Sequence, residues 1–105
     1  MASWVPWFRV EGAGRGRLRL VGELDFAGAP ELRDRLAGIE GDVELDCSGV
    51  TFIDCSGLLA LEESQRGCHA AGVRMYLVAP SRCVSTLVKL VGLDTLFAVR
   101  DGTGS

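Results

Sequence analysis

The chain has 105 residues, which suits one domain with one core, and its 48% hydrophobic content excludes an intrinsically disordered protein. The net charge is −3 and lysine and arginine form no dense run, so the composition argues against nucleic-acid binding. No apolar run approaches the roughly 20 residues of a membrane span, and the N-terminus lacks the features of a secretory signal. We therefore expect a cytoplasmic protein with a single domain over residues 1–105, in which residues 1–6 and 101–105 are flexible.

The first part of the chain predicts a hairpin followed by a helix. Residues 7–12 (WFRVEG) and 17–25 (RLRLVGELD) alternate as strands do, and the glycines between them indicate a turn. Arginines would share the solvent face of the second strand, and leucines the core face. Residues 28–41 predict a helix with a proline in its first turn and either Gly38 or Gly41 at its end. Its apolar stripe is formed by Leu32, Leu36 and Ile39.

The remainder predicts strands and helices in alternation. A strand is expected over 43–47, and a long helix from about Ser56 to Ala71. Residues 73–79 (VRMYLVA) are apolar on both faces, which is typical of a central strand. A third helix is expected within 80–92, with Ser81 as its N-cap and an inner stripe of Val84, Leu87, Val88 and Val91. A short last strand falls within 93–99.

The predicted order is β-β-α-β-α-β-α-β, which indicates an α/β fold. Alternating strands and helices imply right-handed crossovers between parallel strands, and the hairpin adds an antiparallel pair at the start. We therefore expect one mixed β-sheet. The second and third helices both begin at the carboxyl edge of this sheet, where open α/β folds usually bind their ligands.

The junction DCSG, residues 54–57, is the candidate functional site. In the first turn of a helix the backbone N–H groups lack intrahelical partners and the helix dipole is positive, so a phosphate on Ser56 would be stabilised. Gly57 has no Cβ, which would let a partner approach closely. Asp54 either caps the helix or orients the serine hydroxyl. From these residue types alone, an ordinary helix cap is the favoured interpretation.

Catalysis, metal binding and cofactor binding are not indicated. The single histidine, His69, is predicted on the order of 20 Å from Ser56 along the same helix, so no serine–histidine–acid triad can form. The four cysteines contain no C-x-x-C pair. Cys47 and Cys68 are interpreted as packing residues. Cys55 and Cys83 lie near helix N-termini, where the thiol pKa falls, so they are candidates for redox chemistry.

Three segments resemble the STAS domain family, and in particular the small bacterial anti-sigma factor antagonists. DCSGVTFIDCSGLLAL (46–61) resembles the family signature, VGELD (21–25) is similar to its second-strand motif, and LVKLVGLDTLFAV (87–99) to its closing helix, glycine and strand. The resemblance covers nearly the whole chain. It places the family's phosphorylated serine on Ser56. In one departure, Cys55 stands where the family usually has serine or threonine, whose hydrogen bonds a thiol replaces poorly.

The resemblance implies a non-enzymatic phosphoprotein that regulates transcription. The unphosphorylated form would bind an anti-sigma factor that is also a serine kinase, which frees a sigma factor. Phosphorylation of Ser56 would reverse binding, and a serine phosphatase would reset the protein. The implied partner-binding residues lie after the second strand and in the first helical turn: Asp25, Phe26, Asp54, Cys55, Gly57, Leu58 and Leu59. Phe26 and the two leucines are equally compatible with core positions.

Two other functions fit the same residues. STAS-like domains also serve as scaffold subunits in lipid-transport ABC complexes and in stress-signalling complexes, without being phosphorylated. A binding module regulated by cysteine oxidation is the second alternative. The sequence leaves open the identity of the partner, the sigma factor, the signal and the oligomeric state.

Overall fold

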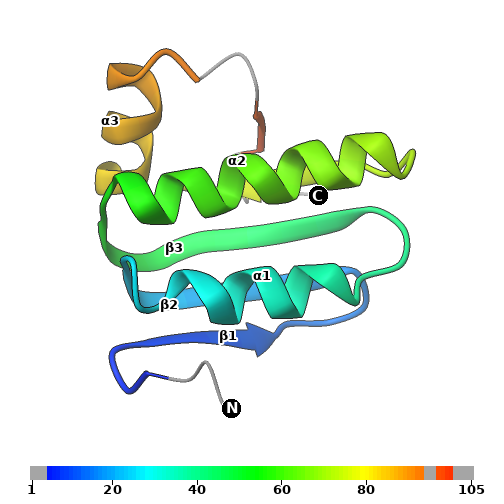
Figure 1. Cartoon of the computed structure of the whole chain (residues 1–105), viewed down its shortest axis with the longest axis horizontal. Coiled ribbons are helices and arrows are strands. Elements are labelled where there is room, and N and C mark those ends of the chain that lie inside the picture. Colours follow the sequence, from blue (N-terminus) through cyan, green and yellow to red (C-terminus); the bar gives the residue numbers. More distant parts are fainter. Residues whose placement is uncertain (1–4, 94–96, 101–105) are drawn as a thin grey trace.

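The computed structural model describes residues 5–93 and 97–100, and within them five strands form a single sheet (Figure 1). The strand order is β1-β2-β3-β4-β5; β1 and β2 are antiparallel and the other pairs are parallel. This confirms the predicted α/β fold with a mixed sheet. The elements in chain order are β1 (Phe8–Gly12), β2 (Arg17–Leu24), α1 (Ala29–Ala37), β3 (Val43–Ile53), α2 (Cys55–Ala70), β4 (Met75–Val78), α3 (Arg82–Leu90) and β5 (Ala98–Arg100).

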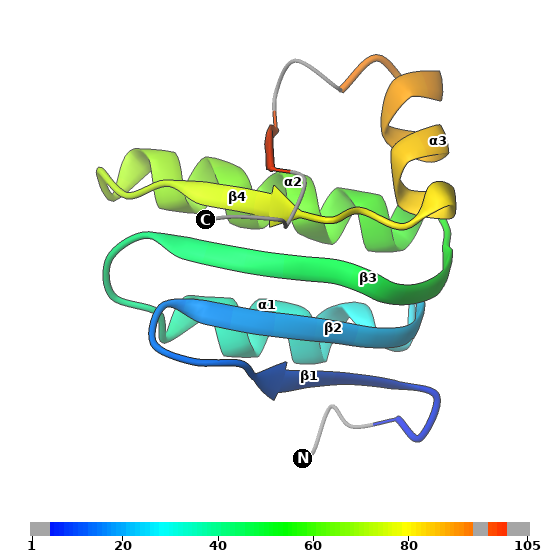
Figure 2. The same cartoon turned by 180° about the vertical axis from the view of Figure 1, so that it is seen from behind.

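The sheet has one covered face and one polar face. Helices α1 and α2 lie side by side over one face, and Figure 2 views the sheet from the opposite side. On the polar face Arg17 pairs with Glu44 at 2.6 Å and Arg19 with Asp46 at 3.4 Å, as expected for exposed arginines on β2. The core lies between the sheet and the two helices. Its fully buried large side chains include Leu20, Leu24, Leu32, Leu45, Leu61 and Leu77.

Strand β3 is six residues longer than the predicted strand over 43–47, and it ends at Ile53. Its second half contains Ser48 and Gly49, which are weak strand formers. The extension is held by β2, which pairs with it up to Leu24 opposite Ile53, through two register shifts. A long-range partner therefore extends the strand beyond what its own residues indicate.

Beside the second half of β3, which β4 does not reach, lies helix α3 instead of a strand. Pairing between β3 and β4 stops at Asp46 opposite Val78, and α3 follows beyond the end of β4 (Figure 2). The Ser81 amide donates to the Cys47 carbonyl at 3.3 Å. The expected inner stripe of this helix is only partly confirmed, since Leu87 is half-buried rather than fully buried. Val84 and Val88 are buried, but Val91 is 44% exposed because the helix ends at Leu90.

The outer edge of β1 is closed by side chains from α1. The Val10 amide donates to Glu31 Oε2 at 2.8 Å, and Arg35 Nη1 donates to the Val10 carbonyl at 2.6 Å. These backbone groups point away from β2, so they would otherwise be open to a further strand. The two side chains therefore attach the hairpin to α1 and block that part of the edge.

Several predictions fall at or beyond the limits of the described residues. The flexible ends were predicted over 1–6 and 101–105, and residues 1–4 and 101–105 lie outside the described residues. Of the predicted flexible residues, only 5 and 6 are described, and there Val5 forms a bridge with Phe8. Part of the last predicted strand, 94–96, also lies outside. The described part of that strand is β5, which pairs with β4.

Candidate functional site

The first turn of α2 is held by Asp54, the residue that joins β3 to the helix. Asp54 has an extended backbone, and its Oδ1 accepts a hydrogen bond from the Gly57 amide at 2.9 Å. Its carbonyl accepts from the Leu58 amide at 3.0 Å. Of the two roles that the sequence left open, the structure shows the helix cap. The cap places Ser56 in the first turn, at the positive end of the helix dipole.

Ser56 is half-buried and opens into a depression of about 290 Å³ between α1 and α2. Among the described residues, its hydroxyl has no hydrogen-bond partner. The wall of the depression is largely apolar, with one cation. Besides Ser56 it is lined by Phe26, Ala27, Ala29, Pro30, Arg33 and Leu59.

Packing against β2 explains why position 57 is a glycine, which the sequence did not reveal. A Cβ at this position would lie 2.2 Å from the Leu24 carbonyl oxygen and 2.8 Å from Leu24 Cγ. The missing side chain therefore makes room for the protein's own strand β2, and this corrects the expectation that it makes room for a partner. Leu58 is also buried, at 4% exposure, whereas Leu59 is 48% exposed. Gly57 and Leu58 thus belong to the interior, and Leu59 to the surface.

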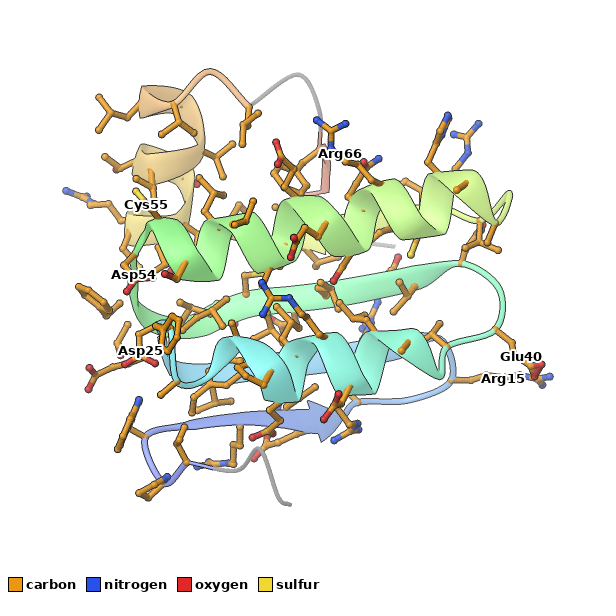
Figure 3. The ribbon with its side chains drawn as sticks, viewed as in Figure 1. Arg15, Asp25, Glu40, Asp54, Cys55 and Arg66 are labelled. Atoms are coloured by element: carbon orange, nitrogen blue, oxygen red, sulfur yellow. The ribbon has the colours of Figure 1, made fainter. Side chains whose placement is uncertain are left out.

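The loop between β2 and α1 lies at the same end of the molecule as the α2 N-terminus. Figure 3 shows Asp25, Asp54 and Cys55 at this end, opposite to Arg15 and Glu40. Asp25 Oδ1 accepts from the amides of Ala27 and Gly28 at 3.1 and 2.9 Å. Phe26, at the tip of this loop, is 80% exposed. The structure therefore brings the two predicted segments together.

Trp7 belongs to this end of the molecule and was missed by the sequence reasoning. Its indole Nε1 donates to Asp25 Oδ2 at 3.0 Å, and its carbonyl accepts from the Glu23 amide at 2.8 Å. No motif connects a tryptophan before β1 with an aspartate 18 residues later. The antiparallel pairing of β1 with β2 creates the contact.

The four cysteines are free thiols in different surroundings. Cys47 is buried, and this burial, with smaller contributions from Asp46 and Cys83, raises its pKa to about 12. Burial also raises the pKa of the half-buried Cys68. Cys83 Sγ lies 3.4 Å from the Val50 carbonyl oxygen. Cys55 is exposed at the first position of α2, directly beside Ser56.

Other kinds of site find no support in the described part of the chain. Residues 5–93 and 97–100 contain no cluster of three or more histidine, cysteine, aspartate or glutamate side chains placed to hold a metal ion. His69 lies exposed at the far end of α2 from Ser56. No helix among the described residues combines the length and apolar character needed to cross a bilayer.

One family model and several solved structures match this chain. The family model described as "STAS domain" matches residues 10–104. Among solved structures, the chain is similar to a Thermotoga maritima protein assigned as an anti-sigma factor antagonist, with 21% identity, a TM-score of 0.73, and coverage of 90% of this chain and 86% of that chain. It is also similar to the anti-sigma factor antagonist SpoIIAA in its unphosphorylated form, with 22% identity, a TM-score of 0.68, and coverage of 88% and 86%. A sulfate transporter family protein from Wolinella succinogenes has 25% identity, a TM-score of 0.74, and coverage of 90% and 83%.

Proposed function

The chain belongs to the STAS domain family, and from this premise we propose that it is an anti-sigma factor antagonist controlled by phosphorylation of Ser56. Its partner is an anti-sigma factor with serine kinase activity. Binding of the unphosphorylated protein frees a sigma factor, phosphorylation reverses the binding, and a serine phosphatase restores it. The protein itself acts by binding and has no catalytic role.

The observation that carries this proposal is the state of the Ser56 hydroxyl. It opens into a surface depression and has no hydrogen-bond partner among the described residues, so modification would break no existing contact. A phosphate there would lie at the positive end of the α2 dipole, which stabilises an anion. The helix could accept the modification without unfolding.

The position of Ser56 also explains why phosphorylation would release a bound partner. Phe26 and Leu59 expose apolar side chains at the same depression as Ser56, and such residues act as anchors in protein interfaces. A phosphate on Ser56 adds about −1.5 to −2 charges beside these anchors. Burying that charge against a docked protein costs several kcal/mol unless it is paired, which is enough to lower affinity by powers of ten.

The relatives support the assignment. SpoIIAA is named an anti-sigma factor antagonist, and structures of both its unphosphorylated and phosphorylated forms resemble this chain, with TM-scores of 0.68 and 0.65. Cys55 is the position at which this chain departs from the family motif. Its thiol is exposed beside Ser56, so the proposed kinase accepts a serine that follows a cysteine.

The chain supplies a matched control for testing this proposal. Its sequence contains DCSG twice, at 46–49 and 54–57. In the first copy Ser48 is exposed, but it lies in β3, and its hydroxyl donates to Asp46 Oδ1 at 2.7 Å. We therefore compare Ser56→Ala, Ser56→Glu and Ser48→Glu with the wild type.

Pull-down from cell extract should recover an anti-sigma factor with wild type, Ser56→Ala and Ser48→Glu, but not with Ser56→Glu. Incubation of the wild-type protein with that purified kinase and ATP should add one phosphate, which mass spectrometry places on Ser56. Modification of Ser81 or Ser85 in place of Ser56 would refute the proposal. Equal recovery of the anti-sigma factor by Ser56→Glu would also refute it.

A scaffold role in a transporter assembly is the second candidate. It is favoured by the similarity to the Wolinella succinogenes sulfate transporter family protein, which reaches a TM-score of 0.74 at 25% identity. In that case the captured partner would be a membrane transport protein. Its binding would be the same for wild type and Ser56→Glu, which separates this candidate from the first.

A further inference from the structure

Trp7 lies outside the stretch that the STAS family model matches, yet it is bonded to the proposed docking surface. Its indole nitrogen donates to Asp25 Oδ2 at 3.0 Å, and the side chain is 43% exposed. Its position is also set by the backbone, because its carbonyl accepts from the Glu23 amide at 2.8 Å. The tryptophan is therefore a fixed part of this end of the molecule.

The end of β2 fits closely against the Trp7 backbone. Gly22 has a φ of +106°, a conformation that side chains rarely adopt. A Cβ on Gly22 would lie 2.0 Å from the Trp7 carbonyl oxygen. This close approach lets the Trp7 backbone lie directly against the end of β2.

Both carboxylate oxygens of Asp25 are engaged within the protein. Oδ1 accepts the amides of Ala27 and Gly28, and Oδ2 accepts the Trp7 indole N–H. Asp25 therefore braces the loop that presents Phe26. The indole N–H bonds Oδ2, the carboxylate oxygen that the loop amides do not use.

We propose that Trp7 is a positioning residue for partner docking, which acts through Asp25 to hold Phe26 beside Ser56. This inference rests on the proposed function. A loop that is already ordered in the free protein spares the ordering cost that a mobile loop incurs when it binds. Loss of the indole N–H should therefore weaken docking without altering the docking residues themselves.

The first test needs no partner. In ¹⁵N-labelled protein, the indole signal of Trp7 is identified with a Trp4→Phe variant, since the chain has two tryptophans. Asp25→Asn keeps an acceptor for the loop amides, but its amide group no longer accepts from the indole. Asp25→Asn should shift the Trp7 indole signal, and Trp7→Phe should speed amide hydrogen exchange at residues 26–28. Unchanged exchange there in Trp7→Phe would overturn the proposal.

The second test is a double-mutant cycle on affinity for the purified anti-sigma kinase. Trp7→Phe and Asp25→Asn should each weaken binding roughly three- to tenfold, as expected for one lost hydrogen bond. The double variant should bind no more weakly than Asp25→Asn, because the indole acts through the aspartate. Wild-type affinity of Trp7→Phe, or additive losses in the double variant, would contradict the positioning role.

The two proposals fail in different ways. If Ser56→Glu binds like the wild type while Trp7→Phe binds more weakly, the phosphorylation switch is wrong and the positioning role stands. If Ser56→Glu abolishes binding while Trp7→Phe has no effect, the switch stands and the positioning role is wrong. Thermal unfolding of each variant confirms that the compared proteins are folded.

Discussion

Replacement of Gly57 by alanine should destabilise the protein, although alanine is the better helix former. The added methyl group would lie 2.2 Å from the Leu24 carbonyl oxygen, 2.8 Å from Leu24 Cγ and 3.0 Å from the Leu24 carbonyl carbon. Strand β2, which contains Leu24, is paired with β1 on one side and β3 on the other. Because this backbone cannot shift alone, α2 must move away from the sheet.

The expected cost follows from two opposing contributions. Overpacking of a well-filled interior costs about 1–3 kcal/mol, and a clash with strand backbone belongs at the upper end. The gain in helix propensity from glycine to alanine offsets about 1 kcal/mol of this. The net loss is about 2 kcal/mol, which corresponds to a fall in Tm of about 10 °C for a domain of this size.

Gly67 offers a control in the same helix. A Cβ there meets no atom within 4 Å, so Gly67→Ala should raise stability by up to about 1 kcal/mol. Urea unfolding followed by circular dichroism measures both variants against the wild type. If Gly57→Ala proves as stable as Gly67→Ala, the tight fit between α2 and β2 is not real.

Three further predictions use the same unfolding assay. Asp54→Ala should lose about 1 kcal/mol with its cap. Ser81→Ala should cost less, because the Ser81 hydroxyl caps no backbone amide and contacts Cys83 Sγ at 3.3 Å instead; equal losses would contradict this. Arg35→Ala should lower stability by about 1 kcal/mol, because it removes the hydrogen bond to the β1 edge. Arg33→Ala breaks only an exposed ion pair and should lower stability by less than half of that. A larger loss in Arg33→Ala than in Arg35→Ala would contradict the edge contact. The pKa of Cys47 is raised from 9.0 to about 12, so the folded state keeps a proton that the unfolded state releases, and stability should fall as pH rises from 9 to 12. Cys47→Ala should make this decline shallower, and an unchanged slope would argue against a buried thiol.

Patterns of neighbouring residues were sufficient to predict most of the fold and the local structure around Ser56. Alternation in 17–25 and the glycine turn before it predicted the hairpin, and the apolar stripe of 28–41 predicted α1. DCSG between a strand and a helix placed Ser56 in a first helical turn, which the structure confirms. These features depend on side-chain periodicity and on capping, which act over a few residues.

Other features required contacts between distant parts of the chain. The second half of β3 is a strand because β2 pairs with it, and Gly57 is small because Leu24 of β2 lies against it. Leu58 and Leu59 are adjacent and identical, and only packing decided that Leu58 is buried and Leu59 exposed. The bond between Trp7 and Asp25 spans 18 residues and exists only once the hairpin has formed. Local sequence specifies conformation through nearby atoms, whereas exposure and close fit depend on which distant surfaces meet in the folded protein.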